Sequence, residues 1–351
     1  MNNRTDIIKN KIPSIYHAFF PDFIEREVPK EKIATCNNCT MQMSPTSATI
    51  NTKCCIYYAQ IPNYLLGGLL QEERVALRKG QEIAKKLIHK KKGISPYGIR
   101  KPVWYKEFEQ AVTLNKTVKT TQSQNEILRC PFYGEDGNCT TWAYREHCCS
   151  THFCFSVGGD AGQKFWKRLD RYLYKIERKL AKYAAEKLGC AYSLTKENIK
   201  SNALCADNSD KTVDLDKYQK IWKGWDGSET DFYIACHQLI GQLTANKFNE
   251  IIGEKMVHEA MELNKSLTVF NNNIIPDKLI WNPSTKIEII NNGFVLLSTA
   301  LGNHKVRMTK LPLLKAFDGS RELMNIAHLA FRAKNNFSND ISKLMEIKVL
   351  N

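Results

Sequence analysis

The sequence lacks every feature that would place the chain in a membrane or direct it to export. No apolar run in its 351 residues approaches the roughly 18 residues that a membrane span needs. The first residues, MNNRTDIIKNKIPSIYHAFFPDF, lack the apolar core and the small-residue cleavage site of a signal peptide. We therefore expect no membrane insertion and a cytoplasmic location.

The common sequence motifs of enzymes are missing as well. The chain has no nucleophile elbow, P-loop or dinucleotide-binding fingerprint, and no Cys-x3-Cys-x2-Cys motif of radical enzymes. GGDAGQ, at residues 158–163, is rich in glycine but has the wrong spacing, and we expect a turn there. Any activity must therefore depend on a bound metal, and the sequence names no substrate.

Acidic residues are too few to balance the basic ones. The 51 Lys and Arg face 36 Asp and Glu, which leaves a net charge of +15. A basic surface attracts nucleic acid, anionic lipid or acidic protein. The excess is mostly lysine in a chain that is also rich in Asn and Ile, so biased genomic composition competes as the cause. We do not favour nucleic-acid binding as the main role.

Cysteine, by contrast, is abundant and unevenly spread. Nine of the twelve cysteines lie between residues 36 and 154, whereas Cys190, Cys205 and Cys236 are isolated. Disulfides are rare in a reducing compartment, and thiolate is a soft ligand that selects zinc, copper(I) or iron in sulfide clusters. Nine thiols are enough for one four-thiolate cluster with spares, or for two centres.

The nine cysteines lie in two segments of the chain. The first segment has Cys36-x2-Cys39 and, after fourteen residues, the pair Cys54-Cys55. The second begins at Cys130 and ends in EHCCSTHFC, at residues 146–154. Adjacent cysteines rarely ligate the same ion, so one member of each pair is expected to be a core residue or to serve a second centre. The candidate ligands are Cys36, Cys39, Cys54, Cys55, Cys130, Cys139, Cys149 and Cys154, with Cys148 as the expected spare.

Three further residues of the second segment are candidates for cofactor binding. His147 and His152 can ligate a metal, donate to a cluster sulfur or act in acid–base chemistry, and we expect them beside the ligands. Arg145 would offset the negative charge of a thiolate-bound cluster.

CPFYGEDGNCTTWAYREHCCSTHFC, at residues 130–154, resembles the second half of the YkgJ-type cysteine-cluster family, which chelates zinc or iron. CNNC and TKCC, between Cys36 and Cys55, resemble its first half, although the gap after Cys39 is wider than usual. IPNYLLGGLL and FWKRL resemble a longer subgroup of bacterial proteins. The resemblance implies that both halves meet around a metal centre, often an iron–sulfur cluster. The matching second-half residues are Cys130, Pro131, Phe132, Asp136, Cys139, Trp142, Arg145 and Cys149.

Two more distant resemblances bear on function. A Cys-Cys pair followed by Cys-Pro-Phe-x6-Cys is similar to flagellin lysine N-methylase, which implies a protein-modifying methyltransferase and S-adenosylmethionine as a candidate cofactor. LLKAFDGSRELMNIAHLAF and ISKLMEIKVL are similar to PqqD-like domains, winged-helix modules that bind a leader peptide as an added edge strand. A generic winged-helix or packing subdomain is the alternative.

Apolar periodicity predicts a largely helical chain. Residues 64–92 are expected to form one long or two shorter amphipathic helices, and residues 229–264 one or two helices with Cys236 and His237 in the core. Residues 164–188 predict a strong amphipathic helix, whose opposite face carries basic residues offset by Asp170 and Glu177. Residues 286–309 alternate around an Asn-Asn-Gly turn, which predicts a β-hairpin and a further strand.

We therefore predict a mostly α (α+β) protein with a cysteine-rich helical metal-binding domain over residues 1–264 and a winged-helix, PqqD-like module over residues 265–351. The leading hypothesis is an iron–sulfur protein, with a 4Fe–4S cluster, that modifies or handles a peptide or protein recruited by the C-terminal module. The alternatives are a non-catalytic zinc-stabilised binding module, a lysine N-methylase-like enzyme and a nucleic-acid-binding winged-helix protein.

Overall fold

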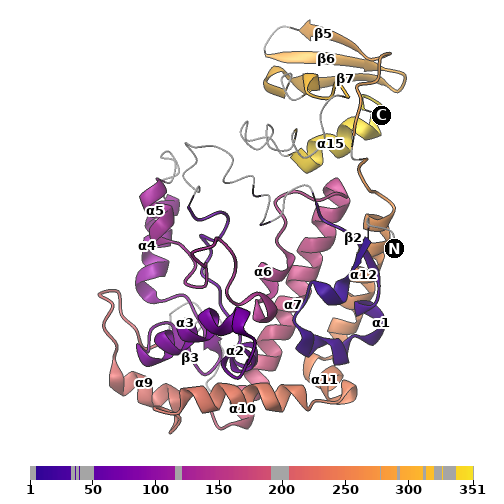
Figure 1. The fold of residues 1–351 in the computed structure, drawn as a ribbon. Coiled ribbons are helices and arrows are strands. Elements are labelled where there is room, and N and C mark those ends of the chain that lie inside the picture. The colour runs from indigo at the N-terminus through magenta and orange to yellow at the C-terminus, as the bar shows by residue number, and fades with distance from the viewer. Residues whose placement is uncertain are drawn as a thin grey trace.

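The computed structural model describes residues 5–32, 36, 39, 51–114, 121–190, 205–276, 278–290, 293–310, 314–319, 326 and 337–350. This part of the chain is mostly helical, and its strands form small antiparallel sheets (Figure 1). The predicted mostly α (α+β) class is confirmed. None of the helices described is both long enough and apolar enough to cross a membrane.

A 29-residue helix, α7 (Gly159–Lys187), runs through the helical body. Its buried apolar side chains recur at three- and four-residue steps, so the amphipathic helix predicted for residues 164–188 is confirmed. The helix begins at Gly159, inside the segment expected to be a turn. A Cβ atom on Gly158 would lie 2.3 Å from the Phe270 ring, so only glycine lets this end of the helix pack so closely.

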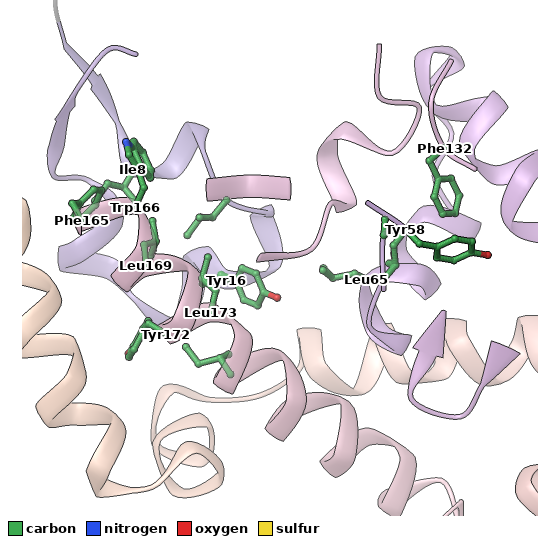
Figure 2. Close-up of a cluster of buried hydrophobic side chains, with 14 of the residues drawn as sticks. Ile8, Tyr16, Tyr58, Leu65, Phe132, Phe165, Trp166, Leu169, Tyr172 and Leu173 are labelled. Carbon is green, nitrogen blue, oxygen red and sulfur yellow. The ribbon is translucent and has the colours of Figure 1, made fainter. Parts of the chain in front are cut away.

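The N-terminal segment packs against α7. Its elements are β1 (Thr5–Ile7), η1 (Ile8–Asn10), η2 (Ser14–Phe19), α1 (Pro21–Ile24) and β2 (Glu27–Pro29), and β1 pairs with β2. Figure 2 shows Ile8 and Tyr16 of this segment in one buried cluster with Leu169 and Leu173 of α7. The N-terminal segment therefore belongs to the core of the helical body.

Residues 64–92 form two helices, α2 (Asn63–Leu70) and α3 (Arg78–His89), with η4 (Val75–Leu77) before α3. Every residue of α2 is buried, so its predicted amphipathic character is wrong. The reason is its contact with α10 (Glu229–Gly241): a Cβ atom on Gly67 would lie 1.8 Å from the carbonyl oxygen of Tyr233. Helix α3 alone is amphipathic, and it buries Ala84 and Ile88.

Residues 229–271 form three helices rather than one or two, because Gly253 adopts a φ of 76° between α11 and α12. Cys236 is fully buried, and His237 Nδ1 lies 2.9 Å from the Tyr64 carbonyl oxygen, which suits the core roles expected for them. The remaining elements of the body are β3 (Ile94–Ser95), β4 (Gly98–Ile99), α4 (Val103–Leu114), α5 (Gln122–Ile127), η5 (Trp142–Tyr144), α6 (His147–Thr151), α9 (Leu215–Trp222), α11 (Ala245–Ile252) and α12 (Glu254–Asn271).

The C-terminal unit contains a three-stranded antiparallel sheet in the order β5 (Lys286–Ile290), β6 (Phe294–Thr299) and β7 (Gly302–Arg307). The predicted hairpin and further strand are therefore confirmed. The sheet is followed by η6 (Met308–Lys310) and α15 (Phe337–Glu346), which contacts α7 (Figure 1). Helix α12 spans residue 265, where the sequence predicts a boundary. Most of the helical segment predicted over residues 311–332 lies outside the described residues.

Candidate metal centres

Hydrogen bonds to backbone carbonyl oxygens hold the two cysteine segments together. The N–H of Cys130 donates to the carbonyl oxygen of Cys55 over 2.7 Å. Lys53 Nζ donates to the carbonyl oxygens of Cys36, over 3.0 Å, and of Gly137, over 2.6 Å. Lys53 is itself buried. Residues that are about eighty positions apart in the sequence therefore lie side by side at the thiols.

Four thiols of the two segments lie close enough to interact electrostatically, and we call them the Cys130 group. Burial raises the pKa of Cys130 to about 11, and Cys139 adds to the rise. Burial also raises the pKa of Cys149, with contributions from Cys130 and Cys139. The pKa of Cys55 is raised by its adjacent thiol, by burial and by Cys130 and Cys139. The group is Cys55, Cys130, Cys139 and Cys149.

A further four thiols form the Cys154 group. A hydrogen bond to Cys154 holds the pKa of Cys54 well below its usual range. The same contact raises the pKa of Cys154, as do burial and the thiols of Cys39 and Cys36. Cys36 is the exposed member, and burial of its sulfur together with Cys54 raises its pKa. The group is Cys36, Cys39, Cys54 and Cys154.

The two adjacent cysteine pairs differ in their partners, although Cys54 and Cys55 are hydrogen-bonded to each other. Cys54 belongs to one group and Cys55 to the other. Burial raises the pKa of Cys148 to about 12, and its strongest charged neighbours are Glu146 and Asp170 rather than the Cys130 group. Cys54 also contributes to this rise, and Cys148 in turn raises the pKa of Cys149, so Cys148 borders both groups. The three isolated cysteines, Cys190, Cys205 and Cys236, are buried.

The distances between the sulfurs bear on the kind of metal. Among the residues described, no three thiols have sulfur atoms that all lie within 4.8 Å of one another. A tetrahedral zinc ion, with Zn–S distances of about 2.3 Å, would hold its sulfurs about 3.8 Å apart. A cluster whose irons stand at separate corners takes more widely spaced thiolates. As they stand, no three of the described thiols form a tetrahedral zinc site.

Arg145 supplies a buried positive charge beside the thiols. Its guanidinium lies 3.5 Å from the centre of the Trp142 ring, and Nη2 donates to the Lys11 carbonyl oxygen over 3.1 Å. Burial lowers the pKa of Arg145, whereas Cys139 and Cys149 raise it. The guanidinium of Arg145 therefore lies near the thiols of Cys139 and Cys149.

The two histidines of EHCCSTHFC face different partners. His152 Nε2 lies 4.0 Å from Cys154 Sγ, and a hydrogen bond with Cys54 raises the pKa of His152. His147 faces away from the thiol groups, and its Nδ1 lies 2.7 Å from Asp170 Oδ1. Only His152 is therefore placed beside candidate thiol ligands.

His147 belongs to a set of donors that the sequence did not indicate. Its Nε2 lies 3.6 Å from Glu146 Oε2 and 4.0 Å from Glu177 Oε2. Glu177 is only 4% exposed, so its predicted place on the solvent face is wrong. The sequence spacing could have shown that Glu177 is buried. Glu177 follows Leu173 by four residues and precedes Leu180 by three, which places it on the apolar face of α7.

No family model, curated protein or solved structure matches this chain. The chemistry of the donors and their arrangement are therefore the basis for assigning a function.

Proposed function

We propose that the chain is an iron–sulfur protein with two four-thiolate centres, one held by the Cys130 group and one by the Cys154 group. The observation that carries the proposal is that the adjacent thiols Cys54 and Cys55, although hydrogen-bonded to each other, have different partners in the second segment: Cys154 for Cys54, and Cys130 and Cys139 for Cys55. Thiolate donors select iron–sulfur clusters or zinc, and no three of the described thiols form a tetrahedral zinc site as they stand. Bound clusters of this kind supply electron transfer.

The residues around the thiols would tune the two centres differently. Cys130 and Cys149 are partly buried, and Arg145 would compensate negative charge near this group. The Cys154 group lies closer to solvent, because Cys36 is exposed. An electron donor or acceptor would therefore approach the Cys154 group, since exposure and nearby charge set both access and reduction potential.

The C-terminal unit would recruit a peptide or protein substrate along strand β5. This strand is an edge of its sheet, and its Ile287 and Ile289 are 43% and 68% exposed. Their cross-strand neighbours on β6, Leu297 and Val295, are fully buried. The apolar face of the sheet therefore continues uncovered to β5, where an added peptide strand would bury it.

Metal analysis tests the two centres. Protein purified without oxygen should be brown, bleach on reduction, and contain about eight iron and about eight sulfide per chain for two 4Fe–4S clusters. Cys130→Ser and Cys154→Ser should each remove about half of the iron, since each change removes a ligand from one centre only. Cys236→Ala, in the core, is the matched control and should keep all of it. Colourless protein with stoichiometric zinc would overturn the proposal.

A peptide display library tests recruitment by β5. Panning random peptides against the full chain should enrich extended, apolar sequences, because an added strand needs alternate apolar side chains. Ile289→Asp should abolish the enrichment, whereas Ile274→Asp, at a residue that is 49% exposed and lies outside the sheet, should leave it unchanged. Enrichment that survives Ile289→Asp, or none with the unmodified chain, would show that β5 recruits no peptide.

A further inference from the structure

A cavity of ≈ 40 Å³ lies beside helix α6, outside both thiol groups. Its lining includes Gln60, Arg100, Glu146, His147 and Glu177. A single water needs about 10–15 Å³ on the same measure, so the space suits an ion and one or two small ligands. The lining combines these charged and polar side chains with apolar surface, and the cavity is partly open to solvent beside the exposed Tyr174.

Three donor atoms converge in this cavity. Glu146 Oε2, His147 Nε2 and Glu177 Oε2 all lie within 4.8 Å of one another. Both carboxylates are nearly inaccessible, with Glu146 1% and Glu177 4% exposed. Two buried carboxylates at this separation repel each other and have lost their hydration, so they favour positive charge beside them, and Arg100 and Arg178 of the lining supply part of it.

The other polar atom of each side chain is held by a separate partner. The Gln60 backbone N–H donates to Glu146 Oε1 over 3.0 Å, and the Tyr16 hydroxyl donates to Glu177 Oε1 over 3.3 Å. These contacts leave Oε2 of each glutamate facing the cavity.

Asp170 orients the imidazole in the same way. His147 Nδ1 donates to Asp170 Oδ1 over 2.7 Å, which leaves Nε2 with its lone pair directed toward the carboxylates. A metal-binding histidine almost always donates its other ring N–H to a carboxylate or carbonyl oxygen. All three side chains are thus positioned by contacts made through their remote atoms.

Arg100 is an independent indication that a ligand belongs here. Its Nε is buried and has no hydrogen-bond partner in the described structure, although it lines the cavity. A buried N–H without an acceptor destabilises the fold, so an oxygen ligand in the cavity would remove that penalty.

We propose that Glu146, His147 and Glu177 bind a divalent metal ion, with an oxygen ligand at an open position beside Arg100. One imidazole and two carboxylates are donors that suit Mn²⁺ or Fe²⁺. A divalent cation bound between the two carboxylates would offset their repulsion directly, whereas Arg100 and Arg178 line the cavity around them. The oxygen ligand is water or a small carboxylate. This site shares no residue with the thiol groups, so it stands or falls separately from the iron–sulfur proposal.

Titration with Mn²⁺ tests the site, because Mn²⁺ prefers oxygen and nitrogen donors to thiolate. The EPR signal of free Mn²⁺ is followed while the full-length, anaerobically purified chain is added. We expect one Mn²⁺ to bind per chain. Glu177→Gln should weaken binding at least tenfold, whereas Glu229→Gln, a matched change of another buried glutamate, should leave it unchanged.

Asp170→Asn keeps the test decisive if Glu177→Gln fails to fold. Asp170 is 35% exposed in its side chain and would act only by orienting His147, so the variant should fold and bind Mn²⁺ about 10–100-fold more weakly. Circular dichroism melting confirms the fold of each variant. Absence of Mn²⁺ binding by the unmodified chain would overturn the site in favour of a metal-free hydrogen-bonded ion group. So would an affinity in folded Glu177→Gln or Asp170→Asn that equals the affinity of the unmodified chain.

Discussion

Helix α6 presents donors of two chemical kinds to its surroundings. Cys149 belongs to a group of thiols, which are soft ligands, whereas His147 lies among carboxylates, which are hard ligands. The two residues are two positions apart, and residues i and i+2 of a helix do not face each other. His147 and Cys149 therefore face different sites, although their closeness in the sequence EHCC suggests a single site.

The strongest test of this separation is to remove one kind of donor altogether. The double variant Cys130→Ser, Cys154→Ser should lose essentially all iron, because it takes one ligand from each thiol group. Its Mn²⁺ affinity should stay within about twofold, since no carboxylate donor is changed. Iron analysis and Mn²⁺ EPR on the same sample check this. Loss of both metals together would show that the two sites are not independent.

Glu31 is a buried carboxylate outside both proposed metal sites, and its pKa makes a prediction about the pH dependence of stability. Its oxygens accept hydrogen bonds from Ser156, Val157 and Trp166, yet burial raises its pKa to about 7. The folded chain therefore holds this proton at pH values where the unfolded chain has lost it. The free energy of unfolding should fall as the pH rises from about 4.5 to about 7, by up to about 3 kcal/mol from this group.

Glu31→Gln should remove that component of the pH dependence. Urea unfolding of both chains at about pH 5 and about pH 8 measures it, and the unmodified chain should lose more stability than the variant. Parallel pH profiles for the two chains would contradict the raised pKa.

The two histidines provide a matched pair on the two sides. His147→Gln should weaken Mn²⁺ binding about tenfold and leave the iron content unchanged, because it removes one ligand of the hard site. His152→Gln should leave Mn²⁺ binding unchanged. It should also lower the reduction potential of one iron–sulfur centre, because a positive charge beside Cys54 is lost. Mn²⁺ EPR measures the first effect and redox titration the second. If His152→Gln weakened Mn²⁺ binding and His147→Gln changed the reduction potential, the two histidines would have to be assigned to the opposite sites.

Cys148→Ser should have the smallest effect. This thiol lies between the two kinds of donor and belongs to neither group. We expect iron content and Mn²⁺ affinity to remain within measurement error of the unmodified chain. A loss of iron comparable with that of Cys130→Ser would place Cys148 among the ligands and change the division of the thiols.

Elements with a strong local pattern were predicted well. Helix α7 and the hairpin of β5 and β6 each carry their periodicity within one segment, so no partner is needed to recognise them. The amphipathic prediction failed for α2, which is buried on all sides because α10 covers the face that sequence alone leaves to solvent. Burial of this kind depends on a helix more than 150 residues later in the chain.

For the sites, the sequence by itself determined which donors are present. Local composition gives the number of thiols and their adjacent pairs, and it places Arg145 and His152 among them. The thiols themselves indicate a soft metal, whereas the carboxylate site was not indicated by the sequence. Only the tertiary structure decided which thiols become neighbours, and that Glu177 of α7 lies against Glu146. Spacing along one helix places a side chain on a face, but the packing of distant segments decides what that face meets.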